Sequence, residues 1–195
     1  MDERLDRWLQ ALVATPGLTA IRDLDEARRV HLDQSLAALE VVRRFSGPIV
    51  DVGSGGGAPG IPLAVALPDR QVTLLEANGR KCVFLREIAA EFPNVTVVQG
   101  RAEEQETDRF GVAVAKALAQ PTVAAEWCLP LVAPGGAAIL YVGPSADEAA
   151  VSRVSGLLGG GPAEQEPGLL VLPKLEPTPS GFPRRPGAAK KRPLA

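Results

Sequence analysis

The sequence has few of the residues on which several classes of protein depend. Its two cysteines, Cys82 and Cys128, lack C-x-x-C spacing, so neither a disulfide framework nor a zinc site follows from them. Because His31 is the only histidine, most metal sites and Ser/His or Cys/His catalysis are disfavoured. Aromatic residues make up 4% of the chain, which argues against a platform that stacks long single strands of nucleic acid.

Long apolar runs are also lacking. No stretch reaches the roughly 18 apolar residues of a membrane-spanning helix. The start, MDERLDRWLQ, is charged and has no apolar signal core, so the expected compartment is the cytoplasm. With 46% hydrophobic and 23% charged residues, the chain has an ordinary globular composition and enough length to bury a core.

Charge is unevenly distributed along the chain. Residues 1–173 carry a formal charge of −7, and residues 174–195 carry +5. The basic end is also rich in proline, so we expect no regular structure over residues 177–195. An acidic body with a basic tail suggests a polyanionic partner for the tail.

Hydrophobic periodicity predicts helices alternating with short strands. The predicted helices span about residues 2–14, 25–45, 59–67, 80–92, 121–132 and 147–158. The predicted strands span about residues 49–52, 71–76, 94–99, 111–115, 137–142 and 169–172.

This alternation predicts an α/β fold: a Rossmann-like doubly wound, mostly parallel sheet with helices on both faces. We divide the chain into a helical extension over residues 1–47, a ligand-binding core over residues 48–176 and a basic tail over residues 177–195.

A glycine-rich loop, within the letters DVGSGGGAPG, joins the first predicted strand to the next helix. Gly53, Gly55 and Ala58 fit G-x-G-x-x-G/A, and so do Gly55, Gly57 and Gly60. The match lies between a strand and a helix, which is the context that a nucleotide-binding loop requires. Glycine there lets the backbone approach a ligand closely. A tight turn without a ligand is the alternative.

Charge bears on the ligand of this loop. Asp51 ends the first strand, and the loop that follows, including Ser54, contains no Lys or Arg. A carboxylate would repel a pyrophosphate and attract a cation, which favours S-adenosylmethionine over NAD. The alternative for Asp51 is a carboxylate that caps the turn.

Two further acidic positions fit a nucleoside. Glu76 ends the second strand next to Ala77, where a carboxylate can accept both ribose hydroxyls of either NAD or S-adenosylmethionine. After the third strand, Ala102 is small enough for a base to pack on it, and Glu103 follows. A solvated charge at Glu76 and a helix-capping role for Glu103 remain the alternatives.

At this point the chain resembles a known family. Most of residues 25–195 is covered by a His-containing helix and four blocks that follow it: DVGSGGGAPGIPLA, VTLLEANGRKCVFL, GRAEE and PTPSGFPRRPGAAKKRPL. They resemble RsmG (GidB), the bacterial 16S rRNA guanine-N7 methyltransferases, whose fold is that of class I S-adenosylmethionine-dependent methyltransferases.

The resemblance implies that Gly53, Ala58, Glu76, Ala102 and Glu103 contact S-adenosylmethionine. The cofactor-binding set that we expect comprises Asp51, Gly53, Ser54, Gly55, Gly57, Ala58, Glu76, Ala77, Ala102, Glu103 and Lys116.

Three residues depart from the family's pattern. Lys116 lies where the family usually has arginine; it would face the cofactor and the target base, and it is our candidate catalytic residue. Lysine keeps the charge but lacks the planar fork of arginine. Gln34 occupies an acidic position of the family's helix motif, and Val142 replaces a lysine.

The implied reaction needs no general base, because guanine N7 carries a lone pair at neutral pH. The enzyme would place a base that lies in a loop or is flipped from its stack. Five tail cations would contact RNA phosphates: Arg184, Arg185, Lys190, Lys191 and Arg192. A solvated basic tail is the alternative for these cations.

Other functions remain open from the residues alone: an NAD-dependent oxidoreductase, a small-molecule methyltransferase, or a non-catalytic RNA-binding protein with the same fold. The expected partner is 16S rRNA or the small ribosomal subunit, with no membrane and no metal. We expect a monomer because every amphipathic helix has a place in the fold.

Overall fold

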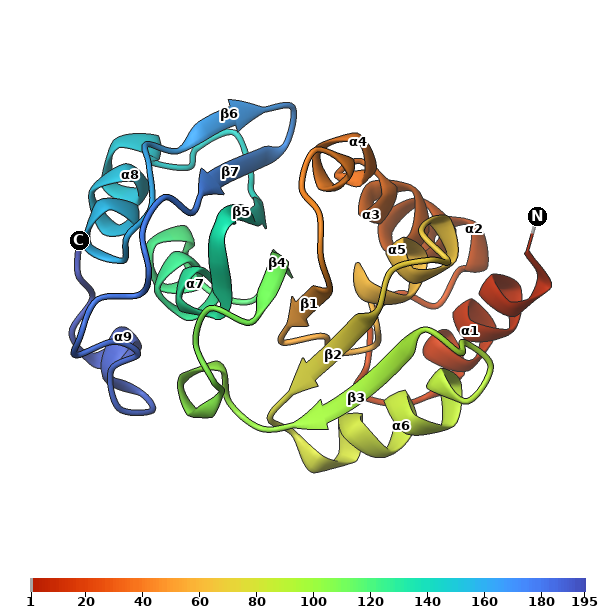
Figure 1. Cartoon of the computed structure of the whole chain (residues 1–195). Coiled ribbons are helices and arrows are strands. Elements are labelled where there is room, and N and C mark those ends of the chain that lie inside the picture. Colours follow the sequence, from red (N-terminus) through yellow and green to blue (C-terminus); the bar gives the residue numbers. More distant parts are fainter. Residues whose placement is uncertain (1) are drawn as a thin grey trace.

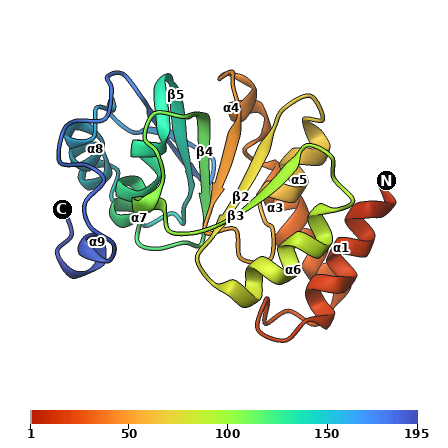
Figure 2. The ribbon, with the colours of Figure 1, turned by 60° about the horizontal axis from the view of Figure 1, so that its bottom comes forward.

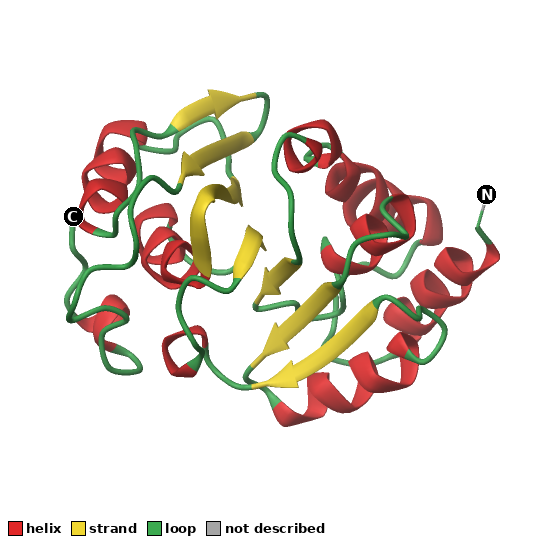
Figure 3. Cartoon of the chain, in the orientation of Figure 1, coloured by secondary structure: helices red, strands yellow, loops and turns green. Residues whose placement is uncertain are grey.

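The structure, a computed structural model, describes residues 2–195, which fold around one seven-stranded sheet (Figures 1 and 3). The strand order is β3-β2-β1-β4-β5-β7-β6; the first five strands in the chain run parallel, and β7 is antiparallel to both of its neighbours. The strands are β1 (Ile49–Val52), β2 (Val72–Glu76), β3 (Val95–Gln99), β4 (Phe110–Lys116), β5 (Val132–Tyr141), β6 (Glu164–Glu166) and β7 (Leu169–Pro173). The predicted Rossmann-like α/β fold is confirmed.

Helices cover both faces of this sheet (Figure 2). One face carries α1 (Glu3–Ala14), α2 (Leu24–Ala27), the π-helical turn η1 (Arg28–Asp33), α3 (Gln34–Leu36), α4 (Leu39–Arg43), α5 (Gly60–Ala66) and α6 (Gly79–Ala89). The other carries η2 (Ala102–Glu104), α7 (Pro121–Cys128), η3 (Leu129–Leu131), α8 (Glu148–Leu157) and α9 (Ala188–Lys191). Among residues 2–195, no helix is both long and apolar enough to span a bilayer.

The sheet separates two hydrophobic cores, and β1 contributes to both. Ile49 packs into the core beneath α1 and α5, whereas Val50 and Val52 pack into the core beneath α7 and α8. Successive side chains of a strand point to opposite faces, so Asp51 points to the same face as Ile49. The neighbours of β1 are β2 and β4. Strand β3 lies beyond β2 in one half of the sheet, and β5, β7 and β6 lie beyond β4 in the other half, so the strand order reverses at β1. Ligand sites in doubly wound sheets lie at the carboxyl ends of the strands at this switch point.

The prediction of one helix over residues 25–45 is wrong. The segment is broken into α2, η1, α3 and α4. Side chains from the sheet bind its carbonyl groups: Lys116 Nζ donates to the Val30 oxygen, and Tyr141 Oη donates to the Ser35 oxygen. Donors inserted into the ladder of a helix distort it, which explains the π-helical turn.

Two other element predictions need correction. The helix predicted over residues 121–132 ends at Cys128, and η3 follows because Pro130 has no N–H to continue the ladder. Strand β5 begins at Val132, ahead of the predicted start at residue 137, and its pairing with β4 shifts register between Phe110 and Val112. Strand β6 was not predicted, because its three residues are polar and poorly buried.

The expectation of no regular structure over residues 177–195 is also wrong. The short helix α9 forms there, with Ala189 only 1% exposed in the second core. Phe182 and Leu194 pack against the same core. The two ends of the chain lie at opposite ends of the molecule, the N-terminus beside α1 and the C-terminus beside α8 (Figures 1 and 2).

Candidate functional site

The glycine loop lies at the carboxyl end of β1 and is fixed by backbone hydrogen bonds. Gly53 N and Ser54 N donate to the Leu75 oxygen of β2 at 2.8 and 3.1 Å. The Ser54 hydroxyl donates to the Asp51 oxygen at 2.8 Å. Gly53 and Gly55 have φ of +73° and +58°, a region that favours glycine. The sequence therefore builds this part of the site mainly from backbone.

Helix α1 supports the loop from outside. Trp8 Nε1 donates to the Gly56 oxygen at 2.8 Å, and a Cβ added to Gly56 would lie 2.2 Å from Leu12 Cδ1. Gly57 is buried beneath the loop, where an added Cβ would lie 2.8 Å from Ile61 Cγ1. Trp8 and Leu12 are supports of the loop that the sequence interpretation missed. Periodicity predicts the helix over residues 2–14 but does not identify the surface that the helix covers.

Asp51 lies in the interior, beneath the loop. Its side chain is 1% exposed, and Oδ2 accepts a hydrogen bond from Gly60 N at 2.9 Å. Among residues 2–195 no donor reaches Oδ1. Burial raises the pKa of Asp51 to about 7, and the hydrogen bond from Gly60 N opposes this shift. Asp51 therefore lies beneath the loop and joins β1 to the start of α5 through Gly60 N. Its effect on the charge of the ligand stays a prediction.

Glu76 lines a cavity of about 280 Å³ on the β2 side of Gly53. It is 8% exposed, and its carboxylate accepts hydrogen bonds from Gly55 N at 3.0 Å and Asn78 N at 2.7 Å. Two backbone donors thus hold the carboxylate at the cavity wall. Other residues that line this cavity include Ala77, Ala102, Glu103, Trp127 and Lys190.

A second cavity, of about 270 Å³, lies on the other side of Gly53. Gly53, Lys81 and Ala117 line both cavities, so the two adjoin. The second cavity is also lined by Ser54, Gly55, Gly56, Ala58, Leu12, Leu18, Val30, His31 and Lys116. The structure thus brings together nine of the eleven predicted cofactor-binding residues and leaves Asp51 and Gly57 beneath them.

Three titratable side chains line the second cavity: His31, Lys81 and Lys116. Partial burial lowers the pKa of Lys116, opposed by the charge of Asp51. Burial, and then the charge of Lys116, lower the pKa of His31, which favours the neutral imidazole. His31 Nε2 lies 3.0 Å from Thr19 Oγ1. His31 was not among the predicted site residues, because a lone histidine on a helix is more often structural; the structure places it in the lining of this cavity.

A third cavity, of about 460 Å³, adjoins the second through Lys116 and Ala117. Gln34, Ala37, Tyr141, Val142, Pro167, Gly168 and Leu169 complete its lining. Ala117 borders all three cavities and has φ of +54°, which is uncommon for a residue with a side chain. Such strained conformations cluster at functional sites, so the end of β4 is the centre of the candidate site.

The predicted RNA-binding cations separate into two groups. Arg184 points inward and pairs with the buried Glu126, with its Nε 2.6 Å from Oε1. Lys190 lies over the ring of Trp127 at 5.2 Å from Nζ to the centroid. Lys190 is exposed despite this contact, and so are the remaining cations, Arg185, Lys191 and Arg192.

The chain is similar to known proteins in sequence and in fold. A family model described as GidB, rRNA small subunit methyltransferase G, matches residues 3–155. A ribosomal RNA small subunit methyltransferase G of Synechococcus elongatus is 38% identical, covering 91% of this chain and 82% of the relative. That of Alkaliphilus metalliredigens is 36% identical, covering 91% of this chain and 83% of the relative.

Solved structures share the fold at low sequence identity. The CurJ carbon methyltransferase superposes with a TM-score of 0.61 at 12% identity, covering 90% of this chain and 68% of that one. The Thermus thermophilus 16S rRNA N2 G1207 methyltransferase, solved with AdoMet and guanosine, gives a TM-score of 0.55 at 16% identity, covering 78% of this chain and 41% of that one. At these identities the likeness supports the fold alone.

The sequence relatives carry the assignment, because each exceeds 30% identity over about nine-tenths of the chain and the family model spans the glycine loop, Glu76, Glu103 and Lys116. This chain therefore belongs to the rRNA small subunit methyltransferase G family.

Proposed function

We propose that this chain transfers the methyl group of S-adenosylmethionine to N7 of a guanine in 16S rRNA. One observation carries the proposal beyond family membership: Lys116 and Ala117 form a wall shared by the second and third cavities. A methyl donor in one cavity and a base in the other would meet at the end of β4.

The first two cavities suit the donor. Ala102 and Glu103 would flank its adenine, and Glu76 would accept hydrogen bonds from the ribose hydroxyls. The backbone of Ser54 and Gly55 and the side chain of Ala58 would lie against the amino-acid end. The fit rests on open space beside Gly55, where an added Cβ would find its nearest atom, Gly53 O, 3.8 Å away.

The third cavity suits the acceptor. Its lining is mainly apolar; the polar side chains are the amide of Gln34, the ammonium of Lys116 and the phenol of Tyr141, whose hydroxyl already donates to the Ser35 oxygen. Cavities of this kind hold flat ligands with a few hydrogen bonds that fix orientation. A guanine flipped out of its stack would offer its O6 to Lys116 and its Watson–Crick edge to Gln34.

The reaction requires no general base from the side chains. Bound S-adenosylmethionine supplies a methyl group activated by its sulfonium. Guanine N7 is already nucleophilic, so the chain's residues orient the base and exclude water rather than remove a proton. Orientation of this kind can contribute about 7–11 kcal/mol to lowering a barrier. Lys116 would hold the base at O6, since its ammonium is already oriented by the Val30 oxygen.

Contacts with RNA would come from the exposed cations of the C-terminal segment. Arg185, Lys191 and Arg192 are exposed and can reach phosphate oxygens. Such contacts supply affinity and little sequence discrimination. Selection of one guanine would then depend on the third cavity and on the shape of the RNA around it.

A methylation assay tests the proposal. The protein is incubated with radiolabelled S-adenosylmethionine and either deproteinised 16S rRNA or small ribosomal subunits, and labelled guanines are mapped by borohydride reduction and aniline cleavage. We expect one cleavage site with at least one substrate form. Absence of label from both substrates, or label at a position other than guanine N7, would contradict the proposal.

A cavity-filling variant tests the acceptor cavity separately. Ala37 is exposed and lines the third cavity, so Ala37→Trp should reduce methylation at least about tenfold while S-adenosylhomocysteine still binds. Ala90→Trp is the matched control, because Ala90 is also an exposed residue that caps the C-terminus of a helix. Equal methylation activity of the two variants would contradict the placement of the target base in this cavity.

A further inference from the structure

The C-terminal segment, residues 177–195, folds back onto the nucleoside side of the donor site, and its first residues are firmly attached. Thr178 donates to the Asp108 carboxylate from its backbone N, at 3.2 Å, and from its hydroxyl, at 2.9 Å. The buried ammonium of Lys174 donates to Thr178 Oγ1 at 2.8 Å and lies 3.5 Å from Asp108 Oδ1. These contacts therefore fix the path of the chain before it reaches Arg184, the first cation of the segment.

Arg184 fastens the middle of the segment. Its Nε and Nη2 donate to the two carboxylate oxygens of Glu126 at 2.6 and 2.5 Å, and Nη2 also donates to the Arg192 oxygen at 2.9 Å. Glu126 is 3% exposed in α7. A buried carboxylate is costly unless it is paired, so this bidentate contact holds the segment against α7.

Beyond Arg184 the segment reaches the wall of the cavity that Glu76 lines. Gly187 N donates to Glu103 Oε1 at 3.1 Å, and the Lys190 ammonium lies over the ring of Trp127. Lys190 and Trp127 line this cavity together with Ala102 and Glu103. The wall of the nucleoside cavity is thus formed by residues more than 80 positions apart in the chain.

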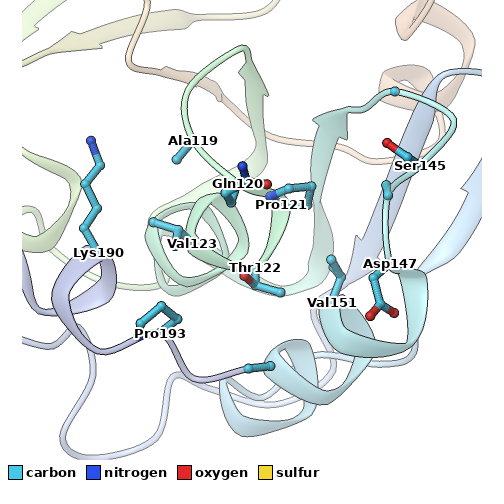
Figure 4. Close-up of a pocket in the computed structure, with 13 residues that line it drawn as sticks. Ala119, Gln120, Pro121, Thr122, Val123, Ser145, Asp147, Val151, Lys190 and Pro193 are labelled. Carbon is cyan, nitrogen blue, oxygen red and sulfur yellow. The ribbon is translucent and has the colours of Figure 1, made fainter.

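The other side of the segment adjoins a different cavity, of about 780 Å³, between α7, α8 and the chain end (Figure 4). Lys190 lines both cavities, and Pro193 lies on the rim of the larger one (Figure 4). Arg185, Lys191 and Arg192 are exposed on the same short stretch. One stretch of nine residues therefore contributes to the nucleoside cavity and also presents cations to solvent.

We propose that residues 184–190 dock against α7 and form part of the wall of the nucleoside cavity, with Arg184 and Glu126 as positioning residues. RNA bound to the exposed cations and a nucleoside bound in the cavity would then stabilise the same docked conformation. This inference rests on the proposed function. It assigns the basic segment a role in binding the donor in addition to attracting RNA.

The first test compares two adjacent arginines by calorimetric titration with S-adenosylhomocysteine. Arg184→Met leaves Glu126 unpaired and frees the segment, so we expect the dissociation constant to rise about tenfold or more, the effect of losing a hydrogen bond to a charged group. Arg185→Met removes the same charge from an exposed position and should change this constant less than about twofold. Equal dissociation constants for the two variants would overturn the proposal.

A third variant and kinetic measurements distinguish loss of the wall from a general loss of stability. Val154→Ala creates a void in α8, where Val154 is fully buried, and serves as a control that lowers the melting temperature without touching the wall. Its affinity for S-adenosylhomocysteine should match the wild type. Arg184→Met should raise the KM for S-adenosylmethionine and leave kcat at saturation close to the wild type. A fall in kcat alone would contradict a positioning role.

The second test measures coupling. The dissociation constant of S-adenosylhomocysteine is determined with and without saturating 16S rRNA fragment. The wild type should bind at least about threefold more tightly with RNA, and the reciprocal effect on RNA affinity should have the same size. In Arg184→Met the factor should approach one. A factor of one in the wild type would overturn the coupling, whereas a wild type that binds no S-adenosylhomocysteine would contradict the proposed function instead.

Discussion

The glycine loop and the C-terminal segment both attract attention in the sequence, but they form their parts of the site in different ways. The loop acts through backbone: Gly53 N and Ser54 N are bound to β2, and Gly55 N is bound to the Glu76 carboxylate. The C-terminal segment acts through long side chains, of which Arg184 turns inward to Glu126 while Arg185 stays exposed.

The difference shows which kind of site a sequence pattern can locate. A backbone site follows from local conformation, because glycines between a strand and a helix fix where the N–H groups lie. A cation on a proline-rich segment has no such local constraint. Its partner depends on tertiary packing, here on a buried acid in α7, 58 residues earlier in the chain.

The largest expected effect comes from closing the space beside the loop. Gly55→Val would place a branched side chain at a φ of +58° against the second cavity, so binding of S-adenosylhomocysteine should fall at least about 100-fold by calorimetry. Gly135→Val is the matched control, because Gly135 has φ of +89° and open space around it. Both variants carry a similar backbone strain of about 1–3 kcal/mol. Similar losses of affinity in the two would mean that strain, not the cavity, is measured.

Lys116→Met separates positioning of the base from binding of the donor. Loss of one preorganised donor typically costs about 100-fold in kcat, and we expect a fall of that size in rRNA methylation. Affinity for S-adenosylhomocysteine should change much less. Lys116→Arg keeps the charge and should retain most of the activity. A methionine variant as active as the arginine variant would remove Lys116 from the reaction.

Asp51→Asn tests how the buried carboxyl beneath the loop affects the free energy of unfolding. The pKa of Asp51 is raised from 3.8 to about 7, so its protonated form stabilises the folded state fully below pH 3.8, and this stability is lost as pH rises to about 7. The slope is at most about 1.4 kcal/mol per pH unit. Urea unfolding across this range should show the slope in the wild type and not in Asp51→Asn, while Asp147→Asn, at an exposed helix N-cap, should keep it. An unchanged slope in Asp51→Asn would contradict this assignment.

The smallest expected effect concerns the exposed cations. Replacing Arg185, Lys191 and Arg192 with Ala should lower the slope of log affinity for RNA against log salt concentration by about 2, at roughly 0.7 for each phosphate contact. The control replaces three exposed arginines elsewhere, Arg22, Arg43 and Arg109. If both triple variants lose the same slope, the attraction comes from net charge and not from this segment.

The order of strands and helices could be predicted because each element carries its own pattern. Alternation of apolar runs with glycine and proline located β1 to β5 and the helices between them. The same reasoning placed Glu76 and Ala102 together, since strand ends in parallel sheets meet at one edge, and the two residues line one cavity. It missed β6, whose residues are polar, and the break in the second helix, which depends on donors from Lys116 and Tyr141 far along the chain.

Side-chain direction was the other missing information. The sequence placed Asp51 at the loop but not on the face beneath α5, because the phase of a four-residue strand with apolar residues on both faces is not readable. It also predicted helix α1 without the glycine loop against which this helix packs. Each miss is a contact between distant segments, which no local pattern encodes.

We propose that the adjoining cavities on either side of Gly53 hold S-adenosylmethionine, and thermal unfolding with S-adenosylhomocysteine or NAD tests this claim. A ligand at 100 times its dissociation constant adds about 2.7 kcal/mol, which corresponds to roughly 5–11 °C for a chain of this size. We predict a shift of this size with S-adenosylhomocysteine and none with NAD at the same concentration. An equal or larger shift with NAD would contradict the claim.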